Sequence, residues 1–338
     1  MIAGVPFDLA LAWGAIIAFG VYAYVVLDGF DLGVGILFLA IRDAERRDTM
    51  VNSIAPVWDG NETWLVLGGA GLLAAFPLAY AVVLPALYAP LIAMLMGLVF
   101  RGVAVEFRFK TERWKPFWDA GFMAGSIVAA FCQGIALGTF IQGIAIEGRA
   151  YAGGWWDWLT PFSLMTGAAL VVGYALLGAT WLIMKTEGGL QERCYWLAWP
   201  LGGAVVALIG VVSVWTPLIE PTVATRWFSW PNIVYLSPVP LLVAAAGFGL
   251  YRALKARHES WPFLFALGLF TLSFVGLGIS LYPYIVPRSV TIWEAAAPDD
   301  SLLFTFIGAA ILIPIILAYT GHAYWVFRGK VGPKEGYH

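Results

Sequence analysis

The chain has 338 residues, of which 61% are hydrophobic and only 12% are charged, and its formal net charge is -2. A soluble domain is about half apolar and about a quarter charged, so this composition excludes a soluble globular protein and predicts an all-α integral membrane protein. The N-terminal segment carries no Lys or Arg before the first apolar run and no small-residue cleavage site. We therefore expect a retained first helix, not a signal peptide.

Apolar runs long enough to cross a bilayer recur along the whole sequence. Runs of about 17 to 25 apolar residues cross as helices, and their lack of alternation argues against membrane strands. We expect one polytopic domain over 1–338, with two four-helix bundles and one peripheral helix. Its nine transmembrane helices are predicted at roughly 9–40, 54–76, 78–104, 117–140, 160–184, 197–217, 236–254, 262–284 and 301–327.

The positive charges between these runs predict the orientation of the chain. When the connecting segments are assigned alternately to two sides, one side receives fifteen of the nineteen Lys and Arg residues and the other receives three. Loops rich in Lys and Arg face the cytoplasm. The split predicts an N-terminus outside and a C-terminus in the cytoplasm. The two ends lie on opposite sides of the membrane only if the number of crossings is odd, as it is for nine helices.

The stretch 56–77 carries polar residues in its first turns, where Trp58, Asp59, Asn61 and Glu62 follow one another closely. An ionisable group inside a membrane helix is costly to bury and therefore indicates a functional site. The orientation places these turns at the cytoplasmic end of the second helix. We take Asp59 and Glu62 as candidates of equal rank, with Trp58 as a weaker one.

Two further spans contain charged residues. Asp28 and Asp31 are three residues apart in the first span, so they share a helix face. Arg101 lies in the third span, where it either extends to the interface or neutralises an acid from another helix. These acids and Arg101 form either the start of a cytoplasmic proton path or a structural ion-pair network. Their spacing along the sequence fits both interpretations equally well.

Histidines are too few for a haem site on this chain. The three are His258 in a loop, His322 late in the last span, and His338 at the end of the chain. Membrane haem proteins hold iron with His or Met side chains from facing helices. We therefore expect no haem or metal bound by this chain's own ligands, and the sequence contains no nucleotide-binding or zinc motif.

Several motifs together resemble subunit II of cytochrome bd-type quinol oxidases, and the pair GFDLGVG and PVWDGNETW is specific. The resemblance covers nearly the whole chain. In order, the motifs are LDGFDLGVG (27–35), NSIAPVWDGNETWLVLGGAGLLAAFP (52–77), FRGVAVEFR (100–108), FIQG (140–143), TPFSLMTG (160–167), YPYIVPRSVTIWEA (282–295) and PIILAYTGHAYW (314–325).

The resemblance implies a function and a set of partners. Enzymes of the family oxidise quinol and reduce dioxygen to water in the bacterial cell (inner) membrane. It implies a heterodimer with a haem-bearing subunit I, which holds the b-type haems, the d-type haem and the substrate quinol. It also implies contact with membrane lipid and quinone, an accessory subunit of one small helix, a structural quinone, and no nucleic acid partner.

By position, Asp28, Asp31, Asp59 and Arg101 match the charged residues of the family's motifs. The resemblance also implies that acids of subunit II take part in a proton route toward the haems. Many relatives have Gln at the position of Glu62, so the resemblance ranks Glu62 below Asp59 as a proton-path residue. The chain is shorter than many relatives around 186–196 and 285–295, and in this it resembles the cyanide-insensitive branch.

Two other functions fit part of the sequence. A proton-coupled secondary transporter would also contain acids within its membrane helices, but the chain shows no inverted repeat. A purely structural scaffold subunit would contain the same acids and Arg101 as a neutralised cluster.

Overall fold

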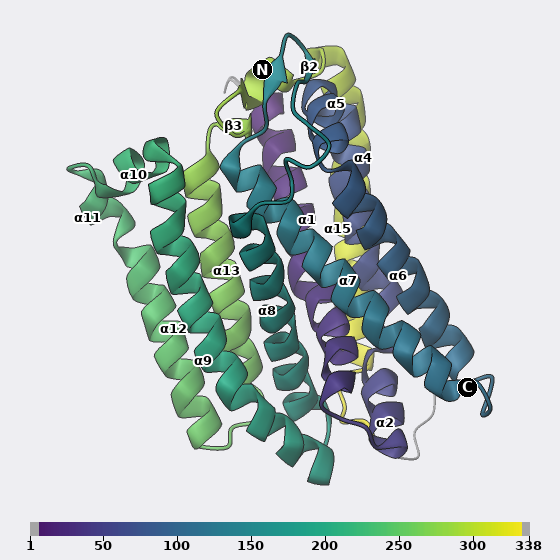
Figure 1. Cartoon of the computed structure of the whole chain (residues 1–338). Helices are drawn as coiled ribbons and strands as arrows, with labels where there is room; N and C mark the ends of the chain where they lie inside the picture. Colours follow the sequence, from purple (N-terminus) through teal and green to yellow (C-terminus); the bar gives the residue numbers. More distant parts are fainter. Residues whose placement is uncertain (1–6, 333–338) are drawn as a thin grey trace.

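The computed structural model describes residues 7–332, and within that range the architecture is helical (Figure 1). Eight of the described helices are long and apolar enough to cross a membrane, which confirms the all-α membrane class. They are α1 (Leu9–Ile36, extended by the 3-10 turn η1, Leu37–Leu39), α6 (Tyr88–Arg108), α7 (Lys115–Gln142), α8 (Pro161–Lys185), α9 (Gly188–Ile219), α12 (Pro238–Lys255), α13 (Trp261–Leu281) and α15 (Asp299–Val326).

Shorter elements connect these helices. Two antiparallel hairpins, β1 with β2 and β3 with β4, lie at the end of the molecule where the N-terminus is marked (Figure 1). The short elements are α2 (Ala44–Ile54), α3 (Trp58–Glu62), α4 (Trp64–Ala75), α5 (Pro77–Ala86), β1 (Ile146–Glu147), β2 (Ala150–Tyr151), α10 (Pro221–Phe228), α11 (Asn232–Leu236), β3 (Tyr284–Val286), β4 (Val290–Thr291) and α14 (Ile292–Ala295).

Neither predicted span 54–76 nor predicted span 78–104 is a single helix. The first is divided at Thr63, whose hydroxyl donates to the Gly60 carbonyl at 2.6 Å and tightens the turn locally. The second is divided at Leu87, two residues after Pro85, which lacks a backbone donor. The chain nevertheless passes from α2 at one end of the molecule to α5 at the opposite end (Figure 1).

Two other boundaries differ from the predicted ones. The helix predicted at 197–217 begins earlier, at Gly188 in α9. The helix predicted at 262–284 ends at Leu281, because Tyr282 precedes Pro283 and adopts extended ψ, after which the chain enters β3.

Helix α8 lies at the centre of the packing, in contact with α1, α7, α9 and α13. Its approach to α1 is very close, because Gly33 of α1 lies against the backbone of Tyr174 and Gly178 on α8. Glycines permit such an approach between membrane helices. A second close pair, Gly97 of α6 and Gly125 of α7, brings those two helices together.

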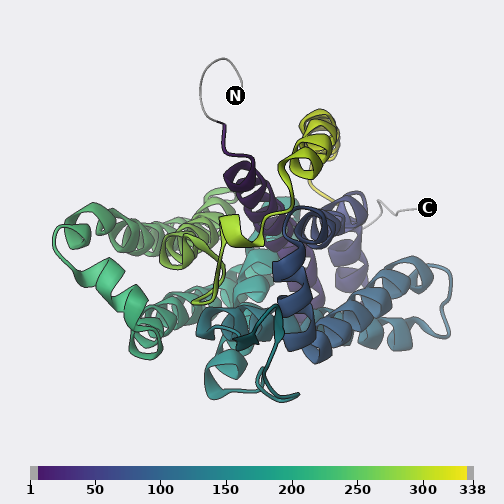
Figure 2. The same cartoon turned by 90° about the horizontal axis from the view of Figure 1, so that it is seen from above.

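Seen from above, the helices form an elongated array, with α10 to α12 (green) at one end and α6 and α7 (blue) at the other (Figure 2). Helix α15 packs mainly on α1 and α4 and has few buried residues. Its ends are nevertheless held: Trp13 Nε1 donates to the Leu302 carbonyl at 3.0 Å, and Lys185 Nζ donates to the carbonyls of Phe327 and Gly329.

The contact between α1 and α8 gives a first prediction. A methyl group on Gly33 would overlap the carbonyl of Tyr174, so Gly33→Ala should lower the free energy of unfolding by about 1–3 kcal/mol through overpacking. The measurement is the thermal unfolding of the purified membrane complex. Gly203→Ala in α9 is the matched control, since a Cβ there meets no atom within 4 Å; equal losses in both variants would contradict the packing argument.

Candidate functional site

Four ionisable side chains of α1, α3 and α6 gather inside the molecule, and we call Asp28, Asp31, Glu62 and Arg101 the core charge cluster. Arg101 Nη1 lies 2.5 Å from Asp28 Oδ1, and Arg101 Nη2 lies 3.3 Å from Glu62 Oε2. The side chains of Arg101 and Asp28 are 0% exposed, whereas that of Glu62 is 29% exposed. Arg101 is thus buried and paired, and it does not extend to an interface.

An aromatic ring lies beside the guanidinium. Arg101 Cζ lies 5.5 Å from the centroid of the Trp58 ring, a cation–π geometry. Trp58 and Glu62 are four residues apart on α3, so both reach Arg101 from the same helix face. The short helix α3 therefore supplies both an apolar and an acidic contact to the cluster.

Asp31 belongs to a second set of contacts, a chain of hydrogen bonds. Asn61 Nδ2 donates to Asp31 Oδ2 at 2.7 Å, and the Tyr324 hydroxyl donates to Asn61 Oδ1 at 2.8 Å. Asp31 and Asn61 are 0% and 1% exposed. These two hydrogen bonds connect α1, α3 and α15, and α15 is distant in sequence from the other two helices.

Close helix packing positions these side chains. Gly125 of α7 lies against the backbone and Cβ of Arg101, which leaves the guanidinium free to extend toward α1. On α1, Gly29 lies against the Tyr174 ring of α8, so α1 is held between its neighbours at the level of Asp28 and Asp31. The glycines of LDGFDLGVG therefore bring helices into contact around the two acids.

Asp59 does not join the cluster in the way the sequence indicated. It is exposed, and the ion-pair partners of Arg101 are Asp28 and Glu62. Trp58, Asn61 and Glu62 share the inward face of α3, and Asp59 lies off that face. The structure thus brings Glu62, the weaker candidate, to the guanidinium and leaves Asp59 at the surface of the same turn.

Two residues of the site were not singled out from the sequence. Asn61 was visible as a polar residue in PVWDGNETW, but an amide carries no charge to mark it. Tyr324 lies nearly 300 residues from Asp31, and although it stands in the motif PIILAYTGHAYW, that motif alone does not indicate which residue it contacts. Only the packing of α15 against α1 and α4 reveals that Tyr324 belongs there.

A second group of charges, the α2 ion-pair network, joins α2 to the facing ends of α6 and α7. Arg108 lies seven residues after Arg101, two turns along α6, and is also fully buried. Its Nε lies 2.5 Å from Asp119, and its Nη1 lies 2.5 Å from Asp48. The other two pairs are Arg47 with Asp119 and Lys115 with Asp48.

The histidines lie away from the core charge cluster. In the described part of the chain, His258 is in the loop after α12, and His322 is exposed on α15 beside Trp325. His338 lies outside the described residues. Over residues 7–332, no three His, Cys, Asp or Glu side chains are grouped to hold a metal ion.

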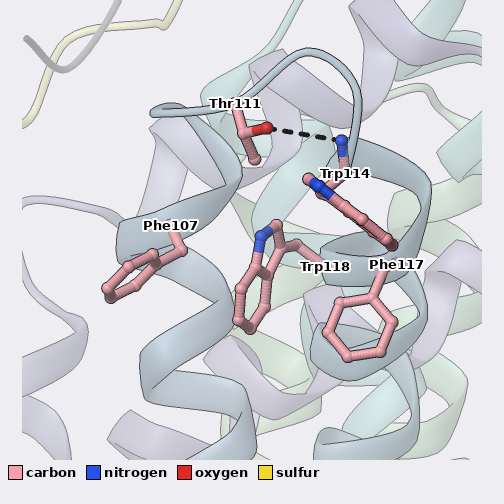
Figure 3. Close-up of a pocket in the computed structure, with 5 residues that line it drawn as sticks. All are labelled: Phe107, Thr111, Trp114, Phe117 and Trp118. Atoms are coloured by element: carbon pink, nitrogen blue, oxygen red, sulfur yellow. Dashed lines mark hydrogen bonds between the residues drawn. The ribbon is translucent and has the colours of Figure 1, made fainter.

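Surface pockets lie elsewhere. One, of about 340 Å³, is lined at the α6–α7 turn by Phe107, Thr111, Trp114, Phe117 and Trp118 (Figure 3). A larger one, of about 480 Å³, lies between α11 and the end of α13 and includes Arg226. Neither lining includes a member of the core charge cluster, so these pockets form no part of the candidate site.

The buried pair makes the second prediction. Arg101→Met leaves Asp28 buried without its counter-charge, and breaking such a pair from one side costs about 3–5 kcal/mol. We expect much less assembled complex in the membrane and a lower unfolding temperature. The control is Arg257→Met, which removes the exposed pair with Glu192 and should change little. Normal assembly of Arg101→Met would contradict the pairing.

Comparison with known proteins reveals relatives over almost the entire chain. The family model described as cytochrome bd terminal oxidase subunit II matches residues 9–327. The cytochrome bd-I ubiquinol oxidase subunit 2 of Escherichia coli (strain K12) is 32% identical over 370 residues, covering 97% of this chain and 96% of the relative. The cytochrome bd ubiquinol oxidase subunit 2 of Bacillus subtilis (strain 168) is 28% identical, covering 96% and 97%.

A solved structure shares the fold. The structure of bd oxidase from Geobacillus thermodenitrificans contains a chain that matches with a TM-score of 0.72 at 17% identity, covering 93% of this chain and 98% of that one. The family match covers far more than half of the sequence and includes every residue of the core charge cluster. The chain belongs to the cytochrome bd terminal oxidase subunit II family.

Proposed function

We propose that the chain is the non-haem subunit II of a terminal oxidase that couples the oxidation of quinol to the reduction of dioxygen to water. The observation that carries the proposal is the end-to-end match to the family and to relatives named ubiquinol oxidase subunit 2. Family membership and the apolar helices make the chain a multi-pass protein of the bacterial inner membrane.

The partner in this proposal is a haem-bearing subunit I. The haems, b-type with a d-type or a further b-type, would be bound there, because the described histidines of this chain lie in a loop and on an exposed helix face. A small single-helix accessory subunit and a structural quinone complete the proposed assembly, and both rest on the family resemblance alone.

We also propose that α3 and α4 together form a ninth crossing. Thr63 between them keeps right-handed helical dihedrals, and the chain runs from α2 to α5 across the molecule (Figure 1). Nine crossings with the N-terminus outside keep fifteen of the nineteen basic residues on the cytoplasmic side. The contacts favour one bundle of α1, α3–α4, α6 and α7, a second of α8, α9, α12 and α13, and α15 at the periphery.

The core charge cluster is proposed to supply part of a proton-uptake path from the cytoplasm. Together with Asp59, which lies outside the cluster, its acids are graded in exposure: Asp59 is at the surface, Glu62 is partly exposed, and Asp28 and Asp31 are fully buried. Asp59 would receive protons, and Glu62 would connect it to the buried acids. Arg101 and Trp58 would hold Glu62 and Asp28 in place.

The alternatives are less well supported. Membership of an oxidase family argues against a proton-coupled transporter. A scaffold role differs from a proton path only in what the acids do, since both require the Asp28–Arg101 pair.

The first test is the identity of the partner. The chain purified from its native membrane should bring with it a coloured, haem-bearing subunit, and the complex should consume oxygen when quinol is added. The measurement is an absorption spectrum together with oxygen uptake. A colourless, solitary protein that moves a solute would point to the transporter.

The path makes a separate prediction. Asp59→Asn should lower quinol-driven oxygen consumption several-fold with normal haem content, because an amide cannot accept a proton in place of the carboxylate. Glu45→Gln, another exposed acid of the neighbouring helix α2, is the control and should keep wild-type turnover. Full turnover in both Asp59→Asn and Asp31→Asn would exclude the path, and loss of haem in these variants would favour the scaffold.

A further inference from the structure

The charges of the core cluster do not balance. Three carboxyl groups, those of Asp28, Asp31 and Glu62, face one guanidinium, that of Arg101. The next buried cation along α6, Arg108, is paired with Asp48 and Asp119 in the α2 ion-pair network. Within residues 7–332, Asp31 takes part in no ion pair, so the cluster would be doubly negative if every acid were ionised.

The three acids differ in how an ionised form would be stabilised. Asp28 contacts Arg101 directly at 2.5 Å. Glu62 contacts the same guanidinium at 3.3 Å, and its exposed fraction of 29% allows water to solvate it. Asp31 is 0% exposed, and its one hydrogen bond is donated by an uncharged amide. An isolated buried carboxylate is very costly, and such a group takes up a proton instead.

We propose that Asp31 is a neutral carboxylic acid that holds an exchangeable proton, while Asp28 is the ionised partner of Arg101. The hydrogen bonds assign the proton to one oxygen. Asn61 donates to Oδ2 of Asp31, and the Tyr324 hydroxyl, by donating to the amide oxygen, holds the amide in that orientation. Oδ2 is therefore an acceptor, and the proton is on Oδ1, which has no partner among the described residues.

Among the described groups around Asp31, none is a better resting place for the proton, since Glu62 is partly solvated and contacts Arg101. The ionisable groups acting on it are Asp28 of α1, Glu62 of α3, Arg101 of α6 and Tyr324 of α15. Arg101 is a permanent cation, and Asp28 is held ionised by it. Tyr324 already donates its hydroxyl proton to Asn61. Uptake forms one O–H bond at Asp31 Oδ1 and breaks the bond that held the proton on its donor, a hydronium ion or water molecule; release is the reverse transfer, and no electrons change hands.

This proposal refines the proposed proton path but does not depend on it, because a neutral Asp31 follows from burial and pairing alone. Asp28 and Asp31 share a face of α1 and are matched in residue type and burial, yet the proposal makes Asp28 an anion and Asp31 neutral. It also makes Tyr324 a positioning residue, which acts on Asp31 through the amide of Asn61.

The test is infrared spectroscopy of the purified oxidase complex in H₂O and in D₂O. A protonated carboxylic acid has a C=O stretch that shifts in D₂O. We expect Asp31→Asn to remove one such band, and Tyr324→Phe to shift that band without removing it. A spectrum of Asp31→Asn that retains every carboxylic acid band of the wild type would overturn the proposal.

Assembly gives a second, independent readout. Asn resembles a neutral acid in shape and charge, so Asp31→Asn should assemble with wild-type yield and haem content. Asp28→Asn leaves Arg101 without its closest partner and should lower the yield by more than about tenfold. The reverse order of yields would overturn the assignment. If Asp28→Asn does not assemble at all, the infrared comparison of Asp31→Asn with wild type still decides.

Turnover separates this proposal from the proton path. If Asp31→Asn loses the band and keeps full oxygen consumption, Asp31 holds a proton that the reaction does not use, and only its place in the path is wrong. If turnover falls and no band is lost, Asp31 matters for the reaction but is not the neutral acid proposed.

Discussion

The contact between Arg101 and Asp28 is the constraint on which the core of this protein depends. Both side chains are fully buried, and neither charge could remain there alone. The pair therefore links α1 to α6 inside the molecule. Glu62 and Trp58 reach the same guanidinium from α3, so three helices are aligned on one cation. A hydrophobic pair could also join the helices, but it would not hold the carboxyl groups of Asp28 and Glu62 in place as the guanidinium does.

Close backbone contact makes this arrangement possible. Gly33 brings α1 against α8, and Gly125 brings α7 against α6 at the level of Arg101. Helices that approach so closely leave little room for water, which raises the cost of any uncompensated charge. The same glycines that pack the bundle thus make the protonation of each acid dependent on its partner. In this way packing and proton chemistry are linked in one site.

The position of α15 shows how a weakly buried helix can contribute to a buried site. Few of its residues are covered, yet Lys185 holds the segment after its end through two carbonyls, and Tyr324 reaches Asn61. Hydrogen bonds at a few points replace a large apolar interface. The exposed faces of α15 and α6 remain available to lipid or to a partner subunit, while their inward faces complete the site.

The sequence by itself determined the membrane class, most of the helices, and the polar residues Asp28, Asp31 and Arg101, because apolar length and the cost of a buried charge are local properties. It did not reveal that Glu62 contacts Arg101 while Asp59 lies at the surface, since one residue along a short helix changes the face a side chain occupies. Tyr324 lies in the motif PIILAYTGHAYW, but its contact with Asn61 was not predicted, and the spans containing α3–α4 and α5–α6 were predicted as unbroken helices. Those features were decided by tertiary structure, because pairing across α1, α3, α6 and α15 depends on which faces meet.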